Sequence, residues 1–229
     1  MTDIRARDAG DALHAIANKL NGARVLEPEG LDTLLRVARD LKGKKRSPGW
    51  RLEVDRGTPV RFKVGMASDG TKVRPKIDYA SINVNQALVD RPPFDCFDLA
   101  IVLEDEAEMP LSRWHIDLAN ASGGAAQSGP LFHLQFGGRN NGYDRGQDHP
   151  VKEPRWCHPP MELALASEMI VANFFEKAWQ ELREDRSWCA SINLFQKLCY
   201  ESYLQRLQLC LDAPSGSTIL RDVWASNWN

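Results

Sequence analysis

The chain has 229 residues and a formal net charge of −2; 43% of the residues are hydrophobic and 26% are charged. This composition is ordinary for a globular protein, and the length allows one large domain or two small ones with a sizeable core. No apolar run is long enough to span a bilayer, and the N-terminus lacks the apolar stretch of a secretory signal, so no membrane contact is expected. Five cysteines without a C-x-x-C pair favour neither a zinc knuckle nor a disulfide framework, and we expect a cytoplasmic location.

Charge is distributed unevenly along the chain. Residues 1–65 carry 14 Lys/Arg and 9 Asp/Glu, a net of +5, whereas residues 94–117 carry one Arg and seven acids, a net of −6. We therefore do not expect a wholly basic nucleic-acid binder. The basic cluster is formed by Lys42, Lys44, Lys45 and Arg46. It has two interpretations, the end of a helix, where cations are favoured by the helix dipole, or a contact for nucleic acid.

Hydrophobic periodicity predicts two helices followed by strands. Apolar residues recur at helical spacing in residues 9–21 and again in residues 31–41. From residue 50 the period changes to two, and residues 50–54 and 60–64 read as the two strands of a hairpin with one buried face.

Two further strands are expected in the middle of the chain. Residues 76–86 form the first, with Ile77 and Tyr79 turned inward; the change of parity between Tyr79 and Ile82 indicates a bulge or a break. Residues 99–103 are a continuous apolar run, which is typical of a central strand covered on both faces.

The final third of the chain is predicted to be helical. Pro159 and Pro160 suit the first turn of a long apolar helix, where the missing N–H of proline is not needed. Asp185 or Ser187 is the candidate N-cap of a second helix, which runs to about Leu211.

This order of elements predicts a single α+β domain over residues 1–229. We expect a mainly antiparallel sheet of five to seven strands, with two N-terminal helices and two long C-terminal helices packed on one face. The expected divisions are 1–47 for the N-terminal helices, 48–137 for the sheet, 138–158 for a long loop, and 159–229 for the C-terminal helices and tail.

Two short strands in residues 114–136 carry the first candidate site. In a strand, residues two apart face the same way, so His115 and Asp117 share one face, and His133 and Gln135 share another. If these strands pair antiparallel, the four side chains form one polar cluster, suited to a divalent metal or to a general base oriented by a carboxylate. The alternative is the solvated side of a half-buried hairpin. Neither strand contains a diagnostic zinc motif such as H-E-x-x-H.

The second candidate is Cys157, next to His158 and just before the expected helix, where the helix dipole lowers the pKa of a thiol. The order of elements is an N-terminal helix, an antiparallel meander, the pair His149-Pro150, a cysteine and C-terminal helices. This layout loosely resembles that of ubiquitin-conjugating enzymes. That resemblance implies a nucleophilic Cys157. The chain departs from the family, because Val151 stands where asparagine follows the His-Pro pair, and the Tyr-Pro…Pro-Pro segment is missing. The alternative is a structural Cys-His turn.

No P-loop, dinucleotide fingerprint or G-x-S-x-G elbow is present. We therefore expect a cytoplasmic binding or adaptor subunit with a protein partner, since seven tryptophans and the uneven charge suit recognition surfaces. The first alternative is a hydrolytic enzyme that uses His115, Asp117 and His133, with or without a divalent metal, and His158 as a helper. The second alternative is thiol chemistry at Cys157.

Overall fold

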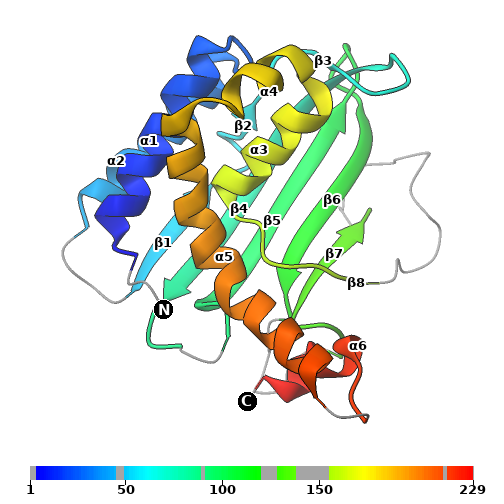
Figure 1. The fold of residues 1–229 in the computed structure, drawn as a ribbon. Coiled ribbons are helices and arrows are strands. Elements are labelled where there is room, and N and C mark those ends of the chain that lie inside the picture. Colours follow the sequence, from blue (N-terminus) through cyan, green and yellow to red (C-terminus); the bar gives the residue numbers. More distant parts are fainter. Residues whose placement is uncertain are drawn as a thin grey trace.

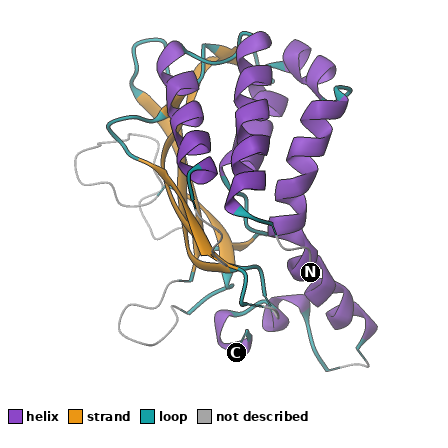
Figure 2. Cartoon of the chain, turned by 90° about the vertical axis from the view of Figure 1, so that its left-hand side faces the viewer, coloured by secondary structure: helices purple, strands orange, loops and turns teal. Residues whose placement is uncertain are grey.

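The computed structural model describes residues 4–44, 49–88, 91–119, 128–137, 155–213 and 216–228. They form an antiparallel sheet with helices packed on one face, which confirms the predicted α+β fold (Figures 1 and 2). The helices are α1 (Ala6–Gly22), α2 (Pro28–Lys42), α3 (Leu163–Phe174), α4 (Glu176–Leu182), α5 (Arg186–Asp212) and α6 (Ile219–Asp222), followed by the 3-10 turn η1 (Ala225–Asn227). The strands are β1 (Gly49–Val54), β2 (Val60–Arg61), β3 (Gly65–Met66), β4 (Lys72–Asn85), β5 (Phe94–Glu104), β6 (Pro110–Leu118), β7 (Phe132–Phe136) and β8 (Trp156–Cys157).

The sheet is built around the long strand β4. The strand order is β1-β4-β5-β6-β7-β8, and β2 and β3 also pair with β4. The described residues form eight strands, where five to seven were expected, because β2, β3 and β8 are two-residue strands. The predicted hairpin between residues 50–54 and 60–64 is wrong, since Val54 pairs with Ala80 and Val60 pairs with Ile77, both on β4. Alternation specifies the buried face of a strand, but it does not specify the partner strand.

The C-terminal helices differ from the prediction at two points. The first helix begins at Leu163, with Glu162 as its N-cap, and not at the two prolines. It is also interrupted at Phe175 (φ −136°, ψ 61°), which separates α3 from α4. The ring of Phe175 lies 6.3 Å from that of Phe62, so the interruption comes where this side chain packs towards the sheet. The N-cap of α5 is Asp185, whose side chain accepts a hydrogen bond from the backbone N–H of Trp188.

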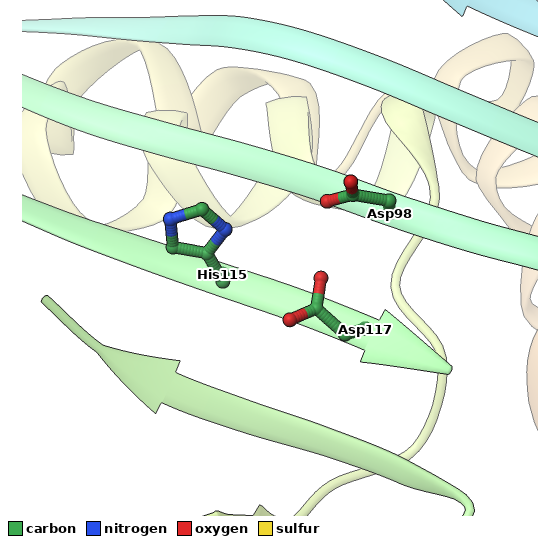
Figure 3. Close-up of side chains that lie close together, drawn as sticks. All are labelled: Asp98, His115 and Asp117. Carbon is green, nitrogen blue, oxygen red and sulfur yellow. The ribbon is translucent and has the colours of Figure 1, made fainter. Parts of the chain in front are cut away.

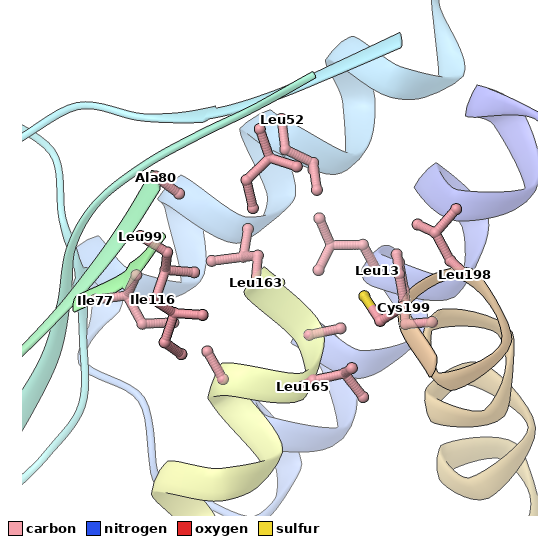
Figure 4. Packing of buried hydrophobic residues seen from close by; sticks show 14 of the residues in the cluster. Leu13, Leu52, Ile77, Ala80, Leu99, Ile116, Leu163, Leu165, Leu198 and Cys199 are labelled. Carbon is pink, nitrogen blue, oxygen red and sulfur yellow. The ribbon is translucent and has the colours of Figure 1, made fainter. Parts of the chain in front are cut away.

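The hydrophobic core lies between the sheet and the helices (Figure 4). Buried side chains reach it from each layer, for example Leu13 of α1, Leu52 of β1, Leu99 of β5 and Leu163 of α3. On the other face of β5, Ala100 and Val102 are also buried, as predicted for a central strand covered on both faces. Among the described residues, no helix is long and apolar enough to cross a membrane.

Candidate metal centre

Polar side chains from three neighbouring strands lie in a row on one face of the sheet. Asp98 of β5 pairs with Asp117 of β6, and Asp117 pairs with His133 of β7. Residues that pair directly across an antiparallel ladder share a face, so these three side chains lie side by side. His115 pairs with Gln135, two residues along, on the same face. The predicted shared face of the two polar strands is therefore confirmed.

This face is the one turned away from the helices. The intervening residues Leu99, Ile116 and Phe132 are buried in the core on the helix side. Figure 3 shows Asp98, His115 and Asp117 projecting from β5 and β6, with the helices behind the strands. The pleat of the strands thus separates an apolar face, which the helices cover, from a face that carries the candidate site.

Asp98, His115 and Asp117 form a group with the geometry of a metal site. Each offers one ligand atom, and the three atoms lie within 4.8 Å of one another (Figure 3). All three side chains are half-buried. Sequence reasoning missed Asp98, which was counted only among the acids of residues 94–117. Asp98 is, however, the one charged residue between Phe97 and Leu103. A charged residue inside an apolar strand indicates a candidate functional residue.

Burial and the closeness of two carboxyl groups together set the electrostatics of this group. Burial raises the pKa of Asp117 to about 8, and the negative charge of Asp98 and a hydrogen bond with it add to the effect. Arg155 and Arg113 act in the opposite direction, lowering the pKa of Asp117. At neutral pH the two carboxyl groups therefore retain a proton, because burial disfavours the charged form of Asp117 and the like charge of Asp98 adds to this effect.

His133 lies next to the group but outside it. Its Nε2 atom is 3.8 Å from Oδ2 of Asp117, and its Nδ1 atom is 3.3 Å from the carbonyl oxygen of Pro130. The side chain is buried, and burial together with the charge of Arg155 lowers its pKa to about 4. His133 is therefore neutral at pH 7. With the Nδ1 proton donated to Pro130, the lone pair on Nε2 faces Asp117.

Of the three residues predicted as ligands, the structure brings together His115 and Asp117 but leaves His133 outside the group. Asp98 and His133 lie on opposite sides of Asp117, on strands β5 and β7. The third member of the converging group is Asp98 and not His133. The role of each residue stays a prediction.

Buried ion pairs lie further along the same sheet. The side chains of Lys76 and Glu104 are in contact, and Lys76 Nζ is 3.6 Å from Oδ1 of Asp78. On the other side, Nη2 of Arg113 lies 3.8 Å from Oδ2 of Asp78. All four residues are less than 9% exposed. This face is consequently more shielded from water than the alternation of polar and apolar residues predicts, and its charges are held in pairs.

The second candidate, Cys157, has a different partner from the one expected. Cys157 is exposed, and its Sγ atom lies 2.9 Å from the hydroxyl oxygen of Tyr203 on α5. The imidazole of His158 is engaged with its own chain, with Nδ1 2.6 Å from the carbonyl oxygen of Pro159. Because α3 begins only at Leu163, Cys157 does not lie at a helix N-terminus, and that reason for a reactive thiolate is removed. Thiol chemistry at this residue stays a prediction.

The remaining predicted positions are only partly described. His149, Pro150, Val151, Lys45 and Arg46 lie outside the described residues. Lys42 is in the last turn of α2, and its Nζ atom lies 3.0 Å from Oδ1 of Asp11, which favours the helix-end interpretation of this lysine. Lys44 is exposed, and a nucleic-acid contact through the basic cluster stays a prediction.

Comparisons with family models, with curated proteins and with solved structures find no match for this chain.

Proposed function

We propose that the chain binds a divalent metal cation through Asp98, His115 and Asp117 and uses it for hydrolysis. The observation that supports this most is the convergence of the three donor atoms within 4.8 Å. Carboxylate oxygens and an imidazole nitrogen together suit cations such as Zn²⁺, Mn²⁺ or Fe²⁺. Three protein ligands leave coordination positions for water and substrate, which is typical of catalytic rather than structural sites.

The electrostatics of the group favour a cation. Asp98 and Asp117 pair directly across neighbouring strands, and like charges in this position destabilise a sheet. In the absence of a cation the conflict is relieved by a shared proton, as the raised pKa of Asp117 indicates. A divalent cation would replace that proton and balance both carboxylates at once.

Hydrolysis is favoured by the position of His133. A bound divalent cation lowers the pKa of a water molecule and so supplies a nucleophile at neutral pH. The neutral imidazole of His133 has its Nε2 atom 3.8 Å from Asp117, beside the proposed ligands, and can accept a proton from such a water. His158, expected as a helper, is not assigned a role, because its ring contacts the carbonyl oxygen of Pro159.

The metal site is tested by calorimetric titration of the purified, chelator-treated protein with Zn²⁺ and Mn²⁺. We expect Asp98→Asn and Asp117→Asn to weaken binding by about 10-fold or more, because each removes a charged ligand. Asp95→Asn is the matched control, since Asp95 is an exposed acid on the same strand and accepts a hydrogen bond from Asn85. Equal affinities in the wild type and all three variants would contradict the proposal.

Hydrolysis is tested with chromogenic phosphoesters and carboxylic esters, assayed with and without the cation that binds best. His133→Gln is expected to bind the cation as the wild type does and to lower the rate by about 100-fold, the smallest effect usual for removal of a general base. A metal-dependent rate that is unchanged in His133→Gln would remove His133 from the mechanism. No cation-dependent rate on any substrate would leave a binding site without hydrolysis.

The binding or adaptor function stays a second proposal. It is favoured by apolar side chains at the C-terminal end of α5 and in α6, where Leu204, Leu209, Leu211 and Leu220 are each more than half exposed. Leu204 and Leu211 are two helical turns apart and so lie on the same side of α5. Exposed leucines on one side of a helix are typical of a surface that meets an apolar surface on a partner.

A further inference from the structure

Tyr79 reaches the metal centre because of a bulge in β4. Ile77 pairs with Ile101 of β5, and the next pair is Tyr79 with Ala100, so Asp78 is an extra residue without a partner in this ladder. Without the bulge, Tyr79 would pair with Leu99 on the core face. With it, Tyr79 lies on the face that carries the metal centre. The prediction that Tyr79 points inward is therefore wrong, although the expected irregularity is present close to the predicted place. Bulges often redirect a side chain beside a functional site.

The hydroxyl group of Tyr79 connects two of the three proposed ligands. It donates a hydrogen bond to Oδ1 of Asp98 at 2.7 Å, and its oxygen lies 3.3 Å from Nδ1 of His115. A hydroxyl has one proton to donate, and Asp98 takes it. In the tautomer with its proton on Nδ1, His115 therefore donates a hydrogen bond to the hydroxyl oxygen, and Nε2 is left to bind a cation. Both contacts restrict rotation of the ligand side chains.

The aromatic ring of Tyr79 is itself held in place by charged neighbours. The guanidinium carbon of Arg56, in the turn after β1, is 4.6 Å from the ring centroid, and that of Arg113 on β6 is 5.6 Å away. Both arginines lie within 4.0 Å of the carboxylate of Asp78, the bulge residue. The ring of His115 meets Tyr79 edge-on, with 6.1 Å between centroids. The bulge therefore supplies both the tyrosine and the carboxylate that anchors its two cationic neighbours.

We propose that Tyr79 is a positioning residue of the metal centre, holding Asp98 and His115 in the arrangement that a divalent cation requires. This rests on the proposed function, because it assigns a role to Tyr79 only if the three residues bind a cation. Hydrogen-bond partners of metal ligands contribute about 10- to 100-fold to metal affinity, since they fix ligand orientation before the metal arrives. The proposal concerns the hydroxyl group, which Tyr79→Phe removes while retaining the ring.

The test measures Co²⁺ binding by calorimetry and by the visible absorption of the bound ion, which reports coordination geometry. We expect Tyr79→Phe to weaken Co²⁺ binding by about 10-fold or more and to change the visible spectrum. Tyr200→Phe is the matched control, because Tyr200 is a half-buried tyrosine on α5. It should leave both readouts unchanged. If Tyr79 only stabilised the fold, Tyr79→Phe would lower the unfolding midpoint, but the spectrum of the bound ion would stay as it is in the wild type.

The outcomes separate this inference from the proposed function. If the wild type binds Co²⁺, Asp98→Asn does not, and Tyr79→Phe matches the wild type in affinity and spectrum, the inference is overturned and the metal site stands. If the wild type itself fails to bind, both are overturned. If Tyr79→Phe does not fold, Arg56→Gln replaces it, since it loosens the ring without touching a ligand. It is expected to weaken binding about threefold, and unchanged binding would overturn the inference.

Discussion

Glu162, the N-cap of α3, gives a pH-dependent prediction about stability. Its carboxylate accepts hydrogen bonds from the backbone N–H groups of Ala164 and Leu165, at 2.9–3.0 Å, and the residue is 0% exposed. Burial raises its pKa from 4.5 to about 7, against the effect of the two N–H donors, and the nearby Glu168 contributes a smaller increase. The perturbation is Glu162→Gln, whose amide oxygen can accept the same two hydrogen bonds but cannot ionise.

The sign of the effect follows from proton binding. Between pH 4.5 and 7 the folded protein keeps a proton on Glu162 that the unfolded chain releases, so the free energy of unfolding falls as the pH rises through this range. The difference between the ordinary pKa of 4.5 and the folded-state pKa of about 7, at about 1.4 kcal/mol per pH unit, corresponds to about 3 kcal/mol. The variant should equal the wild type near pH 4 and exceed its stability by about 3 kcal/mol at pH 8.

Urea unfolding followed by tryptophan fluorescence, at intervals from pH 4 to pH 8, measures this difference directly. Subtracting the variant from the wild type cancels the titration of all other groups. Glu181→Gln, on the exposed surface of α4, is the control and should follow the wild type at every pH. The reasoning is refuted if the difference between Glu162→Gln and the wild type is the same at pH 4 and pH 8, or if the variant loses stability as the pH rises.

Two further predictions concern the buried ion pairs and the exposed leucines. Glu104→Gln should lower the free energy of unfolding by about 3 kcal/mol, because it leaves Lys76 buried without its closest carboxylate. Lys76→Met combined with Glu104→Leu should come within about 1 kcal/mol of the wild type in urea unfolding. A double variant as unstable as the single one would count against this. If Leu204 and Leu211 of α5 join two copies of the chain, sedimentation velocity should show a concentration-dependent dimer that Leu204→Asp with Leu211→Asp converts to a monomer. A monomeric wild type at all concentrations would exclude self-association.

Much of the candidate site was visible in the sequence because alternation in a strand is a local property. The pleat alone places His115 and Asp117 on one face, and the ladder then sets His133 beside them. Asp98 joins them only through the register of β5 against β6. Tyr79 joins only through the bulge in β4, which reverses the face expected from counting residues. The local pattern therefore identified half of the centre, and pairing between distant strands supplied the other half.

The fold class follows from local sequence patterns, because helical and two-residue periods reveal which elements form and which side of each is apolar. The layers follow, since the apolar faces of helices and sheet must be buried against each other. Local patterns do not predict that the strands at residues 50–54 and 60–61 both pair with β4, or that the helix from Leu163 ends at Phe174. These choices depend on hydrogen bonds and side-chain packing between residues far apart in the chain, which no local pattern encodes.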